Sequence, residues 1–295
     1  MKYLIFRNWI NIDRINNNVL SLNPNAIEYL NNNQDKINWN CLASNPNAIE
    51  LLRQNPDKIN WRLLSYNPNA IELLKENPNK INWCLLSKNP NAIELLKENP
   101  DKINWIYLSQ NPNAIELLRE NPNKINWYEL SRNPNAISLL KENLDKINWN
   151  CLSQNPNPNA IELLRENKNK INWDALSRNP IAIELLRKNQ DKINWIQLSA
   201  NPNAIELLKE NKEFISWDII SINPNAIELI EKNEKSYSGL SANPSIFTYD
   251  YDKIKEDFQN LGEEIIVLAL HPKRIFKLIE LYGEDEIYNN YFDDD

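Results

Sequence analysis

Residues 67–88 read NPNAIELLKENPNKINWCLLSK, and the same pattern begins again at Asn89. The tryptophans mark the period. Successive tryptophans are 22 residues apart at Trp39, Trp61, Trp83, Trp105, Trp127 and Trp149, and again at Trp173, Trp195 and Trp217. The step from Trp149 to Trp173 is 24 residues long, because Pro-Asn is duplicated at residues 155–159. A fixed period of this length predicts stacked supersecondary units, none of which can bury its apolar face alone.

The first half of each repeat has the signals of a short helix. Asn67 is a favoured N-cap type, and Pro68 would stand at the first helical position, where its missing N–H is not needed. Ile71, Leu73 and Leu74 then form an apolar stripe at helical spacing. The next Asn-Pro predicts the end of the helix at residue 77, because proline disfavours helical geometry in the residue before it.

The second half predicts another helix, which begins at the tryptophan. We expect Asn82 to cap this helix, which carries Trp83 and Leu86. The equivalent position 216 is Ser, another strong capping type, and we interpret it as a working substitute. Helices of two turns are unstable alone, so packing between units must stabilise them, and we expect the buried tryptophan to contribute most.

The resulting fold class is an all-α solenoid of helix pairs (an αα-repeat solenoid) with degenerate terminal caps. A β-solenoid or leucine-rich repeat also fits a 22-residue period and would place Lys-Ile-Asn-Trp on a strand, but the two cap-like starts in each unit favour helices. With packed helices about 8–10 Å apart, about 11 units predict an elongated array roughly 100 Å long.

The predicted domains are an N-terminal cap with a degenerate half repeat (1–22), the tandem repeats (23–244) and a C-terminal helical cap with an acidic tail (245–295). Asn17 stands where the first tryptophan would be, and a polar residue there suits a solenoid end. Residues 245–295 carry five basic and 13 acidic residues, whereas the whole chain has a net charge of −7, so the repeats are close to neutral. We interpret the tail mainly as a solubilising end, with docking as the alternative.

Recognisable catalytic and metal-binding patterns are missing from the sequence. The single histidine, His271, stands at a helix-start position, where capping or surface exposure is expected rather than catalysis. Cys41, Cys84 and Cys151 are scattered and form no metal-ligand spacing, and three isolated glycines cannot build a phosphate-binding loop. The repeated Glu72-type carboxylates have Lys or Arg three residues on, which predicts a solvated face with ion pairs. We therefore expect no enzymatic activity, cofactor or metal.

The same features bear on location. An odd number of scattered cysteines argues against a disulfide framework and for a reducing compartment. No stretch approaches 18 apolar residues, so we expect no membrane span, and residues 1–12 lack the features of a signal peptide. These observations predict an intracellular protein.

Three positions that follow each tryptophan vary, while nearly everything else in the repeat is constant. The first and the third are four residues apart and would share one face of the helix, so stacking would align them into a ridge. Because Tyr and Arg are enriched in binding hot spots, this ridge is the candidate partner-binding site, although variation at unconstrained surface positions explains the pattern equally simply. The candidate residues are Arg62, Tyr66, Lys88, Tyr107, Tyr128, Arg132 and Arg178.

Repeat units of the form Asn-Pro-x-Ala-Ile-x-Leu-Leu … Ile-Asn-Trp-x-x-Leu-Ser, over residues 13–244, resemble repeat proteins of large DNA viruses of amoebae and algae (mimivirus-like). The resemblance implies a viral origin, a place in the host cytoplasm or the virion, and a scaffold role without catalytic residues. We expect a scaffold or adaptor for a protein partner, with a structural component of a virus particle as the alternative. A helical-repeat nucleic-acid binder is a further alternative, which the near-neutral repeats disfavour, because phosphate binding needs a basic surface.

Overall fold

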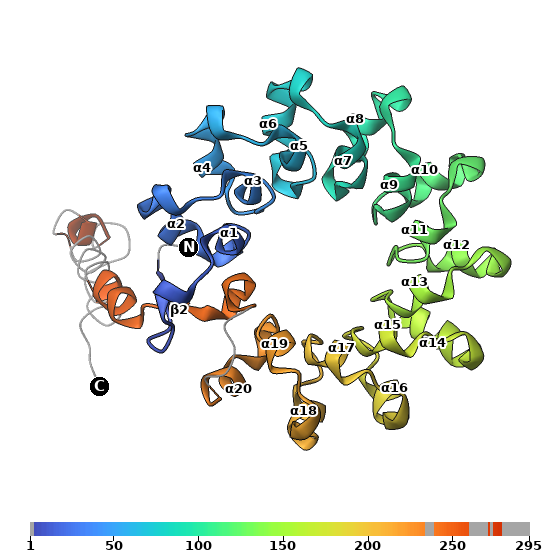
Figure 1. Cartoon of the computed structure of the whole chain (residues 1–295). Coiled ribbons are helices and arrows are strands. Elements are labelled where there is room, and N and C mark those ends of the chain that lie inside the picture. The colour runs from blue at the N-terminus through green and yellow to red at the C-terminus, as the bar shows by residue number, and fades with distance from the viewer. Residues whose placement is uncertain (1–2, 234–238, 260–270, 272–273, 279–295) are drawn as a thin grey trace. The chain divides into compact units, whose positions relative to one another are not determined.

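The computed structural model describes residues 3–233, 239–259, 271 and 274–278. Two compact units divide the chain: residues 6–247 form the first, and residues 2–5 together with 248–295 form the second. The first unit contains all the tryptophan repeats, and its fold is an all-α repeat solenoid, which confirms the predicted class (Figure 1).

Each repeat contributes one inner and one outer helix. The inner helices begin at the tryptophan or its equivalent and are α1 (Asn17–Leu20), α3 (Trp39–Leu42), α5 (Trp61–Leu64), α7 (Trp83–Lys88), α9 (Trp105–Gln110), α11 (Trp127–Leu130), α13 (Trp149–Ser153), α15 (Trp173–Ser177), α17 (Trp195–Ser199) and α19 (Trp217–Ile220). The outer helices are α2 (Ile27–Asn32), α4 (Ile49–Arg53), α6 (Ile71–Glu76), α8 (Ile93–Lys97), α10 (Ile115–Glu120), α12 (Ile137–Lys141), α14 (Pro158–Glu166), α16 (Ile183–Arg187), α18 (Ile205–Glu210) and α20 (Ile227–Glu231).

Asparagine and proline set the helix boundaries. The Asn82 side chain accepts a hydrogen bond from Leu85 N (3.0 Å) and caps α7, as expected. In the other half of the repeat, Asn67 caps a 3-10 turn, Pro68–Ala70, which leads into α6. The chain before each tryptophan is extended for only two residues, so Lys-Ile-Asn-Trp forms no strand and the β-solenoid alternative is wrong.

One capping interpretation is wrong as well. Ser216 precedes α19 with the backbone angles of a cap (φ −81°, ψ 100°), but its side chain accepts no hydrogen bond from the helix. The serine hydroxyl sits one bond closer to the backbone than the asparagine amide oxygen. Ser216 therefore occupies the cap position without replacing the cap interaction.

The core of the first unit consists of leucine and alanine rather than tryptophan. Leu64, Ala70 and Leu74 are fully buried, as are their equivalents around the array. The tryptophans are only half-buried, so the expectation that they form the core is wrong. A lysine of the following repeat covers the indole instead: Lys102 Nζ, for example, lies 4.5 Å from the centre of the Trp83 ring. Such cation–π contacts stabilise a partly exposed ring.

Buried asparagines join successive repeats. Asn67 is fully buried, and its amide nitrogen donates to Ala43 O (3.0 Å) and Asn45 O (2.8 Å) of the repeat before, while its amide oxygen accepts from Asn69 N (3.0 Å). Each buried carbonyl therefore has a partner, which spares the array a large desolvation penalty. We call this series the asparagine ladder: Asn23, Asn45, Asn67, Asn89, Asn111, Asn133, Asn155, Asn179, Asn201, Asn223 and Asn243.

The asparagine ladder closes on itself. Asn23, in the first repeat, donates to Ser241 O (3.2 Å) and Asn243 O (3.0 Å) of the last repeat, just as Asn45 donates to the carbonyls of Ser21 and Asn23. Asn25 likewise donates to Pro244 O (3.0 Å). The first unit is consequently a ring (Figure 1), and the predicted elongated array is wrong. Its two ends pair with each other, so neither is exposed as a solenoid end.

The closure also uses the residues at the two margins of this unit. The rings of Phe6 and Phe247 stack with their centres 4.4 Å apart, and Arg7 N donates to Ile246 O (2.9 Å). Two short strands, β1 (Leu4–Phe6) and β2 (Phe247–Tyr249), pair with each other.

In the second unit the described residues include a helix over 251–259. Tyr3 donates a hydrogen bond to the Asp257 carboxylate (2.9 Å). His271 is exposed at a helix start, where its carbonyl accepts from Arg274 N (2.8 Å) and Ile275 N (3.1 Å), in the position that we expected. The expected acidic tail, after residue 278, lies outside the described residues.

Candidate partner-binding site

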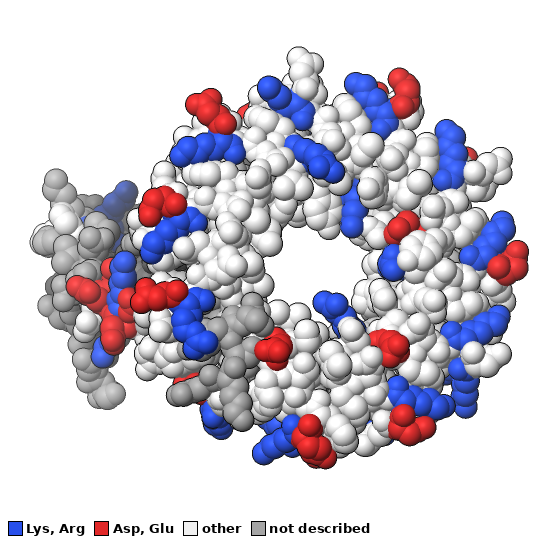
Figure 2. Space-filling model, viewed as in Figure 1, with Lys and Arg blue, Asp and Glu red and all other residues white. Residues whose placement is uncertain are grey.

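The inner helices border an opening through the ring. Figure 1 places the labelled inner helices around this opening and the outer helices at the periphery. Figure 2 shows that charged side chains of both signs are frequent on the outer rim and sparser around the opening. The variable positions after each tryptophan lie at these inner helices, so we call their surface the inner wall.

Large apolar side chains are exposed on the inner wall. Tyr66, Ile106, Tyr107 and Tyr128 follow or belong to α5, α9 and α11, and between 39% and 53% of each residue's surface is accessible; Ile196 on α17 is exposed as well (57%). Aromatic residues are enriched in protein interfaces. We call Tyr66, Ile106, Tyr107 and Tyr128, together with Lys88 and Arg132, the aromatic arc.

The cations of the aromatic arc lie on its tyrosines. Lys88 Nζ is 5.2 Å from the centre of the Tyr66 ring, which belongs to the repeat before. Arg132 lies 4.8 Å from the centre of the Tyr128 ring and donates to its hydroxyl (3.2 Å). These contacts hold long side chains in place before any partner binds, which lowers the entropy lost on binding.

Arg132 also belongs to a small polar cluster. It lies 3.7 Å from the Glu129 carboxylate, which accepts a hydrogen bond from Gln110 of the repeat before (2.6 Å). The neighbouring Cys151 is buried, and burial raises the pKa of its thiol against the opposing influence of Arg132 and Tyr128. A raised pKa favours the protonated thiol, which is a poor nucleophile.

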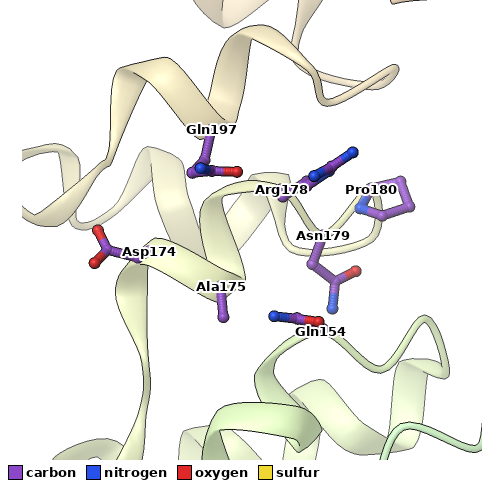
Figure 3. Close-up of a pocket in the computed structure, with 7 residues that line it drawn as sticks. All are labelled: Gln154, Asp174, Ala175, Arg178, Asn179, Pro180 and Gln197. Carbon is purple, nitrogen blue, oxygen red and sulfur yellow. The ribbon is translucent and has the colours of Figure 1, made fainter.

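Arg178 stands apart from the aromatic arc. It lines a hollow of about 440 Å³ that spans three repeats, with Gln154 before it and Asp174, Asn179 and Gln197 around it. Figure 3 shows the Arg178 and Asp174 side chains pointing away from each other. Asp174 accepts a hydrogen bond from Asn194 of the next repeat (2.8 Å) instead.

The seven residues predicted from the sequence therefore fall into two groups. Tyr66 and Lys88 are in contact, as are Tyr128 and Arg132, and Tyr107 lies between these pairs along the chain, whereas Arg178 lies beyond them, after α15. Arg62 is exposed at the second residue of α5. Sequence reasoning did not select Ile106, although an isoleucine at a variable position was a signal for exposed apolar surface.

Some of the variable positions are structural. The residue directly after the tryptophan accepts a hydrogen bond from the capping asparagine of the next repeat where it carries an acceptor: Asn60 donates to Asn40 (2.7 Å), and Asn172 donates to Asn150 (3.1 Å). These side chains extend the contacts between repeats. The residue directly after the tryptophan thus takes part in packing between repeats, whereas the predicted ridge assumed that the variable positions have no structural role.

Within the described part of the chain, no group of three or more His, Cys, Asp or Glu residues could hold a metal ion. No described helix is both long enough and apolar enough to cross a membrane.

Because comparison with known proteins finds no match, the class of this protein is defined by its ring. No family model matches the chain, and neither a curated protein nor a solved structure matches it. The fold and the inner wall define a class: a closed ring of short αα repeats joined by buried asparagines. Its particular function has to be argued from the residues of this chain.

Proposed function

We propose that the ring is a non-enzymatic scaffold that binds a protein partner against its inner wall. The observation that carries the proposal is the aromatic arc, where three tyrosines and an isoleucine are exposed and Lys88 and Arg132 lie on two of the rings. Tyrosine and arginine are among the residue types that dominate the binding energy of protein interfaces. The constant residues of the repeat, in contrast, are occupied by core packing and by the asparagine ladder.

The chemistry of the arc also suits a particular kind of partner segment. Lys88 and Arg132 lie on two of the exposed tyrosine rings, and Arg62 is exposed on α5, which favours a segment that carries both apolar and acidic side chains. The remainder of the inner wall includes Asp174 and Asp218, so no uniformly basic track runs around the opening. A nucleic acid would need such a track for its phosphates, and a protein segment fits the wall better.

The test is a selection from a displayed random-peptide library on the immobilised protein. Each selected peptide is then titrated against a variant with Arg62, Tyr66, Tyr128 and Arg132 replaced by Ala. Truncation of a hot-spot residue costs about 2 kcal/mol or more, so we expect each selected peptide to bind the variant at least about thirtyfold more weakly. The enriched sequences should combine apolar and acidic residues.

The control carries four Ala substitutions on the outer rim, at Glu72, Lys75, Glu94 and Lys97, which form two exposed ion pairs. This variant keeps the net charge and should bind the selected peptides as the wild type does. Peptides that bind the inner-wall variant as tightly as the wild type would rule out the aromatic arc as the binding surface.

A further inference from the structure

The outer edge of the ring carries ion pairs between neighbouring repeats. Arg53 binds Glu76 (2.7 Å), Arg119 binds Glu142 (3.0 Å) and Arg187 binds Glu210 (2.6 Å). In each pair the glutamate lies 23 residues after the arginine. The hydrogen bonds from arginine lower the pKa of the Glu76 and Glu142 carboxyls, so these pairs stay ionised at neutral pH.

Arg165 departs from this pattern. The residue 23 positions after it is Lys188, so two cations stand where an arginine and a glutamate stand elsewhere. Neither residue has an ion-pair partner among the described residues. The position of Lys188 is glutamate in most other repeats, including Glu76, Glu142 and Glu210, and lysine again at Lys232.

A second substitution adds charge at the same place. Lys168 occupies the position that is proline in four other repeats (Pro56, Pro78, Pro100 and Pro122) and lysine again at Lys212. Lys168 also has no ion-pair partner in the described part of the chain. Arg165, Lys168 and Lys188 thus place three cations beside one hollow.

These cations line a hollow with an apolar floor. The hollow has a volume of about 570 Å³ and is lined by Arg165, Lys168, Lys188 and Lys192 together with Ile171, Trp173 and Leu185, and by the side chain of Asn189. No carboxylate is among the lining residues. Lys192 lies 4.9 Å from the centre of the Trp173 ring, which leaves Arg165, Lys168 and Lys188 as the cations without a partner. We call this hollow the basic groove.

We propose that the basic groove binds a phosphorylated small molecule of the nucleotide class. Three unpaired cations at one rim match a multiply charged phosphate chain, since hydrogen bonds between charged groups are among the stronger ones in proteins. Ile171 and Leu185 supply apolar surface for a flat organic ring, and the volume lies within the usual range of small-molecule sites, about 300–1,000 Å³. This site is separate from the inner wall and does not depend on the proposed partner.

The experiment is a calorimetric titration of the full-length protein with ATP in buffer of low ionic strength, where charge interactions are least screened. The decisive variant is Lys188→Glu, which gives Arg165 the type of partner that Arg119 has in Glu142. We expect saturable binding of ATP by the wild type and about tenfold or greater weakening in the variant. The melting temperature without ligand should not fall, because the new carboxylate restores the arrangement of the other repeats.

The control is Lys80→Glu, the same change of charge at an exposed lysine far along the chain from the groove. The control should bind ATP as the wild type does. No saturable binding by the wild type, or equal binding by wild type and Lys188→Glu, would overturn the proposal.

Inorganic tripolyphosphate and adenosine separate the two parts of the site. We expect ATP to bind more tightly than either one, with tripolyphosphate the better of the two because the cations supply most of the attraction. If tripolyphosphate binds as tightly as ATP, the apolar residues of the groove contribute nothing to binding and the nucleotide class is refuted.

Discussion

Four asparagines in one repeat perform four different tasks. Asn111 belongs to the asparagine ladder; Asn113 donates to Pro90 O of the repeat before (2.9 Å). Asn121 donates to Leu117 O at the end of its outer helix (2.9 Å), and Asn126 caps α11 by accepting from Glu129 N (3.0 Å). A short primary amide both donates and accepts, which explains why one residue type recurs at every junction of the repeat.

Removal of a ladder asparagine should be costly. Asn111→Ala leaves the buried carbonyl of Ser87 without its donor, takes one of two donors from Asn89 O, which also accepts from Ala92 N (3.2 Å), and removes the bond to Asn113 N. With about 1–3 kcal/mol for each unsatisfied buried group, we expect the free energy of unfolding to fall by about 2–4 kcal/mol, measured by urea denaturation. Asn113→Ala is the control, because Asn113 is exposed and donates one bond; its cost should be about 1 kcal/mol or less. Equal losses would show that the ladder does not join the repeats.

The capping asparagine should not be replaceable by serine. Asn104 accepts a hydrogen bond from Tyr107 N (3.1 Å), whereas Ser216 accepts none at the equivalent place. We therefore expect Asn104→Ser and Asn104→Ala to lower the free energy of unfolding by similar amounts, about 1 kcal/mol. Thermal unfolding of both variants measures this. A neutral effect of serine alone would restore the simple capping interpretation.

At the scale of the helices, leucines rather than tryptophans connect the inner and outer layers. Leu130 is fully buried, while Trp127 is half-buried beneath Lys146 Nζ, which lies 4.7 Å from the ring centre. The tryptophan thus lies at the edge of the core, and the lysine contacts the exposed part of its ring. The helix depends on its leucine for the buried contact with the outer layer.

This difference predicts the order of two substitutions in α11. Leu130→Ala should lower the free energy of unfolding by about 2–5 kcal/mol, as for a fully buried leucine. Trp127→Ala should cost less than the 3–5 kcal/mol of a buried aromatic, roughly 1–3 kcal/mol, since part of the ring is already in water. Urea denaturation of both variants measures the order. A larger loss for Trp127→Ala would identify the indole as the main core contact.

At the scale of the whole ring, closure changes how damage spreads. A linear array weakened in the middle tends to separate into two blocks, because each repeat contacts only its neighbours. A ring weakened at one junction remains one connected array through the others. Repeats at the two ends of the sequence therefore contribute to stability in the same way as repeats in the middle.

Closure can be tested by comparing two junctions. Asn23 and Asn25 join the first repeat to the last, and Asn111 and Asn113 make the corresponding bonds inside the array. Replacing either pair with Ala should lower the free energy of unfolding by similar amounts, within about 1 kcal/mol, because both junctions lose the same bonds. In an open array the amide nitrogens of Asn23 and Asn25 would bond to water, and their replacement would be nearly neutral. Urea denaturation distinguishes these outcomes.

The sequence alone determined the repeat, the helix pairs and most of their boundaries. These features depend on contacts within about 22 residues: Asn82 caps the helix that follows it, and Pro78 excludes continuation of the helix before it. The stripe of Leu73 and Leu74 is apolar at helical spacing and is buried as expected. Local signals sufficed because each repeat meets the same neighbours on both sides.

Two residues of the sequence agree with a closed ring, although the repeat pattern by itself did not predict one. Asn23 and Asn243 keep the ladder asparagine in the first and last repeats. In an open array, the Asn23 amide would have no backbone carbonyls to donate to, and the Asn243 carbonyl would have no asparagine donor. The degenerate residue Asn17 suggested an exposed end, yet the next repeat positions, Ser21 and Asn23, are fully buried or nearly so. The polar substitution concerned the half-exposed tryptophan position and not the buried ladder.

Only the tertiary structure decided that the array closes, which side faces the opening and where charges gather. A small angle between successive repeats, repeated around the array, determines whether its ends meet. The sequence of one repeat does not reveal the total rotation around the array. The meeting of Arg165 and Lys188 at one hollow is equally invisible in a linear pattern, because it arises only when two successive outer helices lie side by side.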